Sequence, residues 1–269
     1  MGDGLDLDAL LVPSPQTSAD KGNRGRRVST GNAAVNGPDS YLSHQWKPAI
    51  IKACKAVITA EPTITHYDTV WGDADCGLTL KSGANAVLSG FDNQSNNLIP
   101  LDPQQPDLTM AAISELVEDS MGGTSGGIYC IMLDALAAQL QSIREEIPND
   151  QGPTLKQWAT SLEAALETLE QYTTARVGHR TLMDALTPFI QSLLAAASDD
   201  QASPRASLVK AVDAAYQGME GTKKMVPRRG RATYIGGQDE SDTDKYEMPD
   251  PGAYGLYTLL KGLLDASKA

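Results

Sequence analysis

The spacing of apolar residues from about residue 44 onward places the strongest limit on how this chain can fold. Apolar side chains recur every three or four positions, which gives a helix one apolar face. The expected helices do not alternate with strands, so a Rossmann-type sheet is disfavoured. The pattern predicts eight helices, near residues 44–62, 80–90, 110–122, 128–140, 154–169, 181–197, 203–219 and 250–264. The fold class that we expect is all-α, a closed barrel or bundle of eight antiparallel helices.

Prolines and capping residues set the expected ends of these helices. Pro62 is expected to close the first helix, and Pro188 to bend or divide the sixth. Thr154, Ser203 and Asp250 are expected to begin the fifth, seventh and eighth helices, the last two with proline at the first helical position. The fourth helix is apolar nearly all round, so we expect it to be buried.

Residues 1–43 differ in composition from the rest of the chain. The stretch from Pro13 to Pro38 is rich in serine, glycine, asparagine and proline and offers few apolar side chains to bury. Such a segment cannot offset the entropy that is lost when its backbone is ordered. We therefore expect a flexible tail or linker over residues 1–43, followed by one domain over residues 44–269.

Charge and cysteine content narrow the class of protein further. The chain has 34 acidic and 22 basic residues, a formal charge of -12, which argues against binding to nucleic acid or an anionic membrane. Three scattered cysteines favour a reducing compartment over a disulfide framework. The sequence shows neither a signal peptide nor an apolar run of about 18 residues. We expect a cytoplasmic protein, in which a phosphorylated ligand would need metal ions to offset repulsion.

Three aspartates, Asp68, Asp73 and Asp75, lie within eight residues. Gly72 and Gly77 interrupt regular helix around them, so a turn there can aim the three carboxylates at one point. Convergent carboxylates repel unless a cation lies between them, and oxygen ligands select hard ions such as Mg²⁺ or Ca²⁺. The EF-hand spacing fails, so Mg²⁺ shared with the phosphates of a nucleotide fits better. A solvated acidic turn, in which an aspartate caps a helix, is the open alternative.

Two further stretches carry groups that can bind an anion. Residues 121–127 read Met-Gly-Gly-Thr-Ser-Gly-Gly, and Thr124 and Ser125 can donate hydroxyl groups beside a helix N-terminus. This stretch has neither the P-loop lysine nor the GxGxxG spacing. Residues 228–236 hold three arginines, whose planar guanidinium groups suit phosphate. Taken singly, a helix-breaking turn and an exposed basic loop remain open explanations of these stretches.

Five motifs, in order along residues 45–269, resemble the C-terminal, nucleotide-binding (DhaL-type) domain of dihydroxyacetone (glycerone) kinases. They are Asp68-x4-Asp73-Ala-Asp75-Cys-Gly-x-Thr-Leu, Gly122-Gly-Thr-Ser-Gly126, Gly178-His-Arg-Thr-Leu-Met-Asp-Ala-Leu-Thr-Pro188, Gly230-Arg-Ala-Thr-Tyr-Ile-Gly236 and Asp250-Pro-Gly-Ala253. Any one motif is a weak signal, whereas five in the order of the family are a strong one. The Cys-Gly-x-Thr-Leu form is similar to eukaryotic, especially fungal, members.

The resemblance implies a barrel of eight antiparallel helices that binds ATP or ADP at one rim through two Mg²⁺ ions. It implies that Asp68, Asp73 and Asp75 hold the metals and that Arg231 is a catalytic residue that neutralises charge on the nucleotide. It assigns these residues to the nucleotide pocket: Cys76, Gly77, Leu78, Thr79, Thr124, Ser125, Gly178, Thr187, Arg231, Asp250, Pro251 and Gly252.

The implied activity is that of the phosphoryl-donating domain of an ATP-dependent dihydroxyacetone kinase. The single-chain kinases carry a preceding substrate domain, whose histidine holds dihydroxyacetone covalently, and that histidine has no counterpart here. Dihydroxyacetone or glyceraldehyde would therefore be presented by a substrate domain in trans or in a longer parent chain, and the enzyme would be incomplete without it. The two-domain relatives are typically dimers, so a homodimer is a further expectation.

Other functions remain open at this point. The chain is alternatively a stand-alone, non-catalytic nucleotide-binding regulatory module or a truncated kinase fragment. A phosphotransferase-system subunit that keeps ADP as a bound cofactor is disfavoured by the eukaryotic-type motif and the long tail. Some members of the family also cleave FAD to a cyclic flavin nucleotide. The segment over residues 237–249 is long and acidic, and it departs from the pattern of the family.

Overall fold

The computed structural model describes residues 46–91, 99–102, 104–146, 152–198, 203–234 and 247–266. Over these residues the regular structure is helical, without a strand. The elements are α2 (Trp46–Trp71), α3 (Cys76–Ser89), α4 (Pro106–Ser120), α5 (Gly123–Glu146), α6 (Leu155–Tyr172), α7 (Met183–Ala197), α8 (Pro204–Gly221), the 3₁₀ helices η2 (Thr222–Lys224) and η3 (Arg231–Tyr234), and α9 (Pro251–Ala266). The tail expected over residues 1–43 lies outside the described residues.

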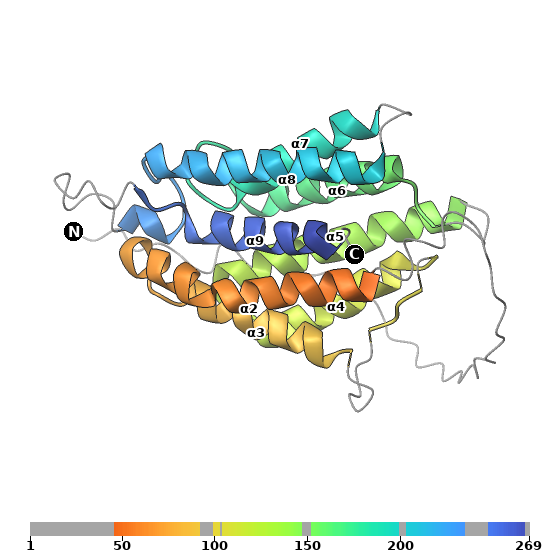
Figure 1. Ribbon diagram of the computed structural model, residues 1–269, viewed down its shortest axis with the longest axis horizontal. Coiled ribbons are helices and arrows are strands. Elements are labelled where there is room, and N and C mark those ends of the chain that lie inside the picture. The colour runs from red at the N-terminus through yellow and green to blue at the C-terminus, as the bar shows by residue number, and fades with distance from the viewer. Residues whose placement is uncertain are drawn as a thin grey trace, which may run out of the picture. The chain divides into compact units, whose positions relative to one another are not determined.

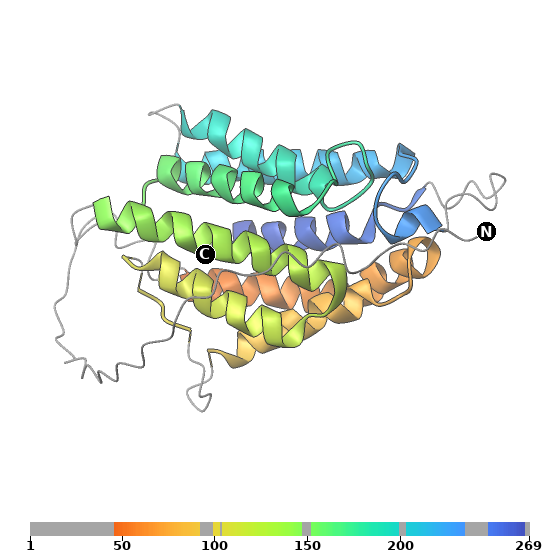
Figure 2. The ribbon, with the colours of Figure 1, turned by 180° about the vertical axis from the view of Figure 1, so that it is seen from behind.

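The eight α-helices of the described chain form a closed ring. Each helix packs against the next one along the chain, and α9 packs against α2 to close the ring. Figure 1 shows α6, α7 and α8 on one side and α2, α3 and α4 on the other, with α5 and α9 between them; Figure 2 shows the same arrangement from behind. Successive helices run in opposite directions, so the predicted all-α barrel of eight antiparallel helices is confirmed.

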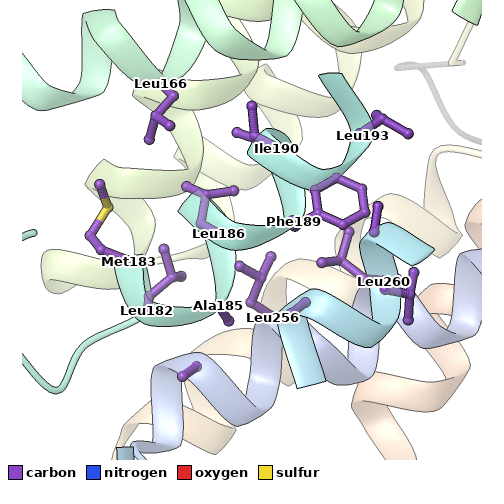
Figure 3. Packing of buried hydrophobic residues seen from close by; sticks show 14 of the residues in the cluster. Leu166, Leu182, Met183, Ala185, Leu186, Phe189, Ile190, Leu193, Leu256 and Leu260 are labelled. Atoms are coloured by element: carbon purple, nitrogen blue, oxygen red, sulfur yellow. The ribbon is translucent and has the colours of Figure 1, made fainter. Parts of the chain in front are cut away.

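Apolar side chains form two large clusters within this ring. The first surrounds α7, where Phe189 and Ile190 pack with Leu166 of α6 and with Leu256 and Leu260 of α9 (Figure 3). The second lies among α2, α3 and α4 and includes Val57, Ile64, Leu80, Val87, Ile113 and Val117. Burial of each large aliphatic or aromatic side chain stabilises the fold by about 1.5–3 kcal/mol. Side chains of α5 and α9 contact both clusters, so these two helices join the halves of the ring.

The ring closes at a contact that only glycine permits. Gly262 of α9 lies so close to α2 that a Cβ there would be 2.6 Å from the Cα of Ala53. Real Cβ atoms do not approach other atoms so closely, so any larger residue at 262 must push the two helices apart. The small residues at positions 53 and 262 therefore set the spacing between α2 and α9.

The first helix does not end at Pro62, as the sequence predicts, but continues to Trp71. Proline removes one backbone hydrogen bond and disfavours the helix interior. Here Pro62 is exposed, and the next turns bury Ile64, Asp68 and Trp71 on the inner face of α2. Burial of these side chains outweighs the local penalty, and the extension carries Asp68 into the site described below.

Two further expectations about helices are corrected. The fourth predicted helix, α5, begins at Gly123 and is less buried than expected, because Ile128, Ile131 and Met132 are only half-buried. A helix in a ring keeps one face toward solvent even where its sequence is apolar. The sixth predicted helix, α7, is not divided at Pro188 but continues through it as one element. Among the described helices, none combines the length and apolarity needed to cross a bilayer.

Candidate functional site

Asp68 fixes the loop that joins α2 to α3. Its side chain is buried, and Oδ2 accepts hydrogen bonds from the backbone N–H groups of Asp75 and Cys76, both at 2.9 Å. The carboxylate therefore caps α3 from the preceding helix. Gly72 lies directly against the Asp68 side chain, where a Cβ would overlap its Oδ1. The result is a tight turn over residues 72–75.

This turn gathers the three predicted aspartates. One oxygen each of Asp68, Asp73 and Asp75 lies within 4.8 Å of the others, with Asp68 buried and the other two exposed. Burial and the charges of Asp73 and Asp68 raise the pKa of Asp75. Three carboxylates so close together offer only oxygen ligands, which suits a hard divalent cation such as Mg²⁺.

The alternative of an acidic turn with a capping aspartate is correct in one respect, because Asp68 does cap α3. Capping does not account for Asp73 and Asp75, whose carboxylates converge on Asp68 beyond the cap. Asp73 also pairs with the guanidinium of Arg231, from η3. A cation therefore already contacts the trio in this structure, and the residues present fit a divalent metal.

The glycine-rich stretch places a second helix N-terminus at the site. Gly123, with φ +64°, begins α5 directly after the turn at Gly122. Ser125 is half-buried and hydrogen-bonds with the Cys76 thiol at the start of α3. Burial raises the pKa of Cys76 to about 12, so this thiol stays protonated at neutral pH. The N-termini of α3 and α5 thus meet, and their free N–H groups favour an anion there.

The arginine-rich stretch lines an open hollow beside the trio. The hollow has a volume of about 570 Å³ and is lined by Thr124, Arg228, Arg229, Gly230, Arg231, Thr233 and Tyr234. Arg231 both lines it and pairs with Asp73, so the hollow adjoins the carboxylates. The backbone N–H of Arg228 donates to the carbonyl of His179 at 3.1 Å, which ties this loop to the segment that holds Gly178.

Asp184 holds that segment in place. Its two carboxylate oxygens accept hydrogen bonds from the backbone N–H of Gly178 at 2.6 Å and of Thr181 at 2.8 Å. Gly178 has a φ of +89°, a conformation that suits glycine. Thr187 lies one turn further along α7, where it is buried and its hydroxyl has no hydrogen-bond partner among the described residues. The described contacts do not join Thr187 to the trio.

Asp250 begins α9 beside the same group of loops. Its Oδ1 accepts a hydrogen bond from the N–H of Ala253 at 2.8 Å, the cap expected from the sequence. Burial raises the pKa of Asp250 to about 6, and the charges of Asp184 and Asp68 act in the same direction. Gly252 lies against Leu182, so the start of α9 contacts the Gly178 segment.

The remaining predicted pocket residues lie in the first turn of α3. Gly77 is buried against α2, where a Cβ would be 2.6 Å from the carbonyl oxygen of Glu61. Leu78 is 55% exposed and Thr79 is half-buried. The turn therefore presents the apolar side chain of Leu78 to solvent next to the trio.

Sequence reasoning missed a buried arginine behind the trio. Arg180 is fully buried, adopts a φ of +60°, and stacks over the ring of Trp71 at 3.7 Å. The available signal was an arginine inside the motif that begins at Gly178, four positions before Asp184. The partners of Arg180 are distant in sequence, so only the fold reveals them.

The model of the DAK2 domain family matches residues 70–265. The chain belongs to the DAK2 domain family. The match includes Asp73 and Asp75, and Asp68 lies two residues ahead of it. The resemblance that the five motifs indicate, to the DhaL-type domain of dihydroxyacetone kinases, is thereby confirmed.

Curated relatives of this DAK2 domain are longer proteins. The dihydroxyacetone kinase of Komagataella pastoris is 38% identical over 264 residues, covering 97% of this chain and 38% of the relative. Dihydroxyacetone kinase 2 of Saccharomyces cerevisiae is 42% identical over 208 residues, covering 77% of this chain and 32% of the relative. The triokinase/FMN cyclase of Mus musculus is 31% identical over 229 residues, covering 83% and 35%. The chain thus spans about a third of the length of these relatives.

A solved structure shares the fold of this DAK2 domain. It is the crystal structure of the dihydroxyacetone kinase from C. freundii in complex with AMP-PNP and Mg²⁺. The TM-score is 0.59 at 23% sequence identity, over 94% of this chain and 38% of the other. The likeness covers the helical ring and shows that the arrangement of helices is shared.

Proposed function

We propose that this chain binds Mg·ATP and is the phosphoryl-donating part of a dihydroxyacetone (glycerone) kinase. The observation that carries the proposal is the meeting of three carboxylates with two helix N-termini and the guanidinium of Arg231. Phosphoryl transfer requires mainly positioning and charge neutralisation, and this site offers both. The names of the relatives, and the AMP-PNP and Mg²⁺ in the C. freundii structure, support it.

In this proposal Asp68, Asp73 and Asp75 hold two Mg²⁺ ions, which supply positive charge to the nucleotide phosphates. Arg231 neutralises further phosphate charge from the other side. The first turns of α3 and α5 line the phosphates with N–H and hydroxyl groups, from Cys76, Gly77, Leu78, Thr79, Thr124 and Ser125. The residues Gly178, Thr187, Asp250, Pro251 and Gly252 complete the nucleotide pocket.

The acceptor, dihydroxyacetone or glyceraldehyde, is presented by a separate substrate domain in this proposal. The chain spans only 38% of the kinase of Komagataella pastoris, which leaves room for such a domain in the relative. The same partial coverage supports a second candidate, a nucleotide-binding module that regulates a partner without turnover. We also infer a cytoplasmic location and leave the oligomeric state to experiment.

Calorimetric titration of the chain with Mg·AMP-PNP tests the nucleotide site. Asp73→Ala is expected to abolish or strongly weaken binding, because it removes a metal ligand. Asp213→Ala is the matched control, since Asp213 is an exposed aspartate on α8 that contributes to neither the trio nor the hollow. Unchanged affinity in Asp73→Ala would refute the assignment.

A second experiment separates the kinase from the regulatory module. Purified substrate-domain protein, Mg·ATP and dihydroxyacetone are mixed with the chain, and phosphorylated triose is measured. Product formation that is lost in Asp73→Ala supports the kinase. Tight nucleotide binding without product supports the module instead, and a parallel reaction with FAD reports any cyclic flavin nucleotide.

A further inference from the structure

Arg180 lies at the junction of three segments that surround the candidate site. It follows Gly178 in the segment held by Asp184, and its side chain is fully buried. A bulky residue with a positive φ is uncommon, and such backbone persists where the surrounding contacts hold it in place. In this conformation the guanidinium of Arg180 contacts two other segments near the site.

The first contact leads to the metal-binding turn. The guanidinium carbon of Arg180 lies 3.7 Å from the ring centroid of Trp71, which is itself buried. Trp71 is the last residue of α2 and directly precedes the turn that carries Asp73 and Asp75. A planar guanidinium stacked on an indole fixes the orientation of both groups.

The second group of contacts leads to the start of α9. The Nε of Arg180 donates to the carbonyl of Thr222 at 3.2 Å, and Nη2 donates to the carbonyl of Met248 at 2.9 Å. The hydroxyl of Thr222 in turn accepts from the backbone N–H of Asp250 at 2.8 Å. One side chain thus holds the end of α8 and the segment that leads into the Asp250 cap.

Charge, as well as geometry, favours a buried arginine at position 180. Asp68, Asp184 and Asp250 are buried carboxylates near one another. Burial raises the pKa of Asp250, and the positive charge of Arg180 works against that rise. A buried cation among buried carboxylates lowers the cost of burying them.

We propose that Arg180 is a positioning residue that couples the metal-binding turn after α2 to the start of α9, so that the carboxylate trio and the Asp250 segment keep one arrangement for Mg·nucleotide. This inference rests on the proposed function. Arg180 does not itself touch metal or nucleotide in it. Its effect passes through Trp71 on one side and through Thr222 and Met248 on the other.

Trp71 provides a direct reporter of this coupling. The chain has three tryptophans, and the other two, Trp46 and Trp158, lie together with ring centroids 5.4 Å apart. Trp46 begins the helix that Trp71 ends, so the two are about 37 Å apart along a 26-residue helix. In a Trp46→Phe, Trp158→Phe background, the fluorescence reports the base of the metal-binding turn alone.

The test compares Arg180→Lys with Arg176→Lys in that background. Lysine keeps the charge of Arg180 but loses the planar stack and the forked hydrogen bonds. Arg176 is the matched control, because it lies in the same segment and donates to the carbonyls of Thr173, Ala175 and Glu170. Affinities for Mn²⁺ alone and for Mg·AMP-PNP are measured by calorimetry, and folding is checked by urea unfolding.

Arg180→Lys is expected to change Trp71 emission before any ligand is added. It is also expected to weaken Mn²⁺ and Mg·AMP-PNP binding by about 10–100-fold, the loss typical when a side chain that supports the metal-binding residues is removed. Arg176→Lys is expected to leave both affinities unchanged. Unchanged affinities in a folded Arg180→Lys overturn this inference but not the proposed function. An equal loss of affinity in Arg176→Lys does the same. Failure of the parent chain to bind Mg·AMP-PNP overturns the proposed function and this inference with it.

Discussion

The guanidinium of Arg231 pairs with the carboxylate of Asp73, one of the three carboxylates that converge after α2. Both side chains are partly exposed, and such pairs contribute about 0.2–1 kcal/mol. In the proposed complex the same guanidinium contacts the phosphates, while Asp73 binds the metal. Arg231 must therefore exchange one anion for another when Mg·nucleotide binds.

Arg231→Ala is accordingly expected to have opposite effects on metal and on nucleotide. Affinity for Mn²⁺ alone rises by up to about fivefold, because the competing cation is gone. Affinity for Mg·AMP-PNP falls, because a phosphate partner is lost. Calorimetry measures both. Arg229→Ala is the control, since Arg229 lines the same hollow but donates to the hydroxyl of Thr174; a fall in Mn²⁺ affinity in Arg231→Ala would contradict the exchange.

Asp68 has two roles that substitution can separate. Asparagine keeps an oxygen that can accept from the N–H groups of Asp75 and Cys76, whereas alanine does not. Asp68→Ala is expected to lower the free energy of unfolding by about 1 kcal/mol more than Asp68→Asn does. Both variants are expected to lose more than tenfold in Mn²⁺ affinity, because both lack the carboxylate.

Asp107→Asn provides the control for Asp68. Asp107 is also a buried aspartate, but it pairs with Arg144 at 2.9 Å and takes no part in the trio. Its substitution is expected to lower stability and leave Mn²⁺ affinity unchanged. Urea unfolding and Mn²⁺ titration on the same samples decide the matter, and metal binding retained in Asp68→Asn would count against Asp68 as a ligand.

The aspartate trio was predictable because its members lie within eight residues, so that one turn can bring them together. Caps at Thr154 and Ser203 were predictable for the same reason, since each bonds to a backbone three residues away. The contacts of Arg180 span 42 and 68 residues, and no local pattern records them. Pro62 shows where a local pattern misleads. Proline predicts the end of the helix there, but the burial of Ile64 and Trp71 outweighs that preference and the helix continues.

The buried carboxyl of Asp250 gives the chain a pH dependence whose sign can be worked out. Burial raises its pKa in the folded chain from 3.8 to about 6. Between these values the folded chain keeps the proton that the unfolded chain releases. The free energy of unfolding therefore falls by about 2–3 kcal/mol from this group as the pH rises from about 4 to 6. Above pH 6 this contribution stays constant.

Asp250→Asn isolates that contribution. Asparagine keeps the oxygen that accepts from Ala253 but does not titrate. The difference in unfolding free energy between variant and parent is expected to grow in favour of the variant from pH 4 to 6. Urea unfolding at a series of pH values measures it, and a difference that stays constant across this window would show that Asp250 has its ordinary pKa.

The close approach of Gly262 in α9 to Ala53 in α2 gives a final prediction about stability. Gly262→Ala places a Cβ against the backbone of Ala53, so α2 and α9 must separate, at a cost of about 1–3 kcal/mol. Gly127→Ala is the matched control, because a Cβ there meets open space within α5. Alanine is a better helix former than glycine, so this variant is expected to gain about 0.5–1 kcal/mol. Urea unfolding of both proteins tests the prediction: if Gly262→Ala were as stable as the parent chain, the ring would not depend on this approach of α2 to α9.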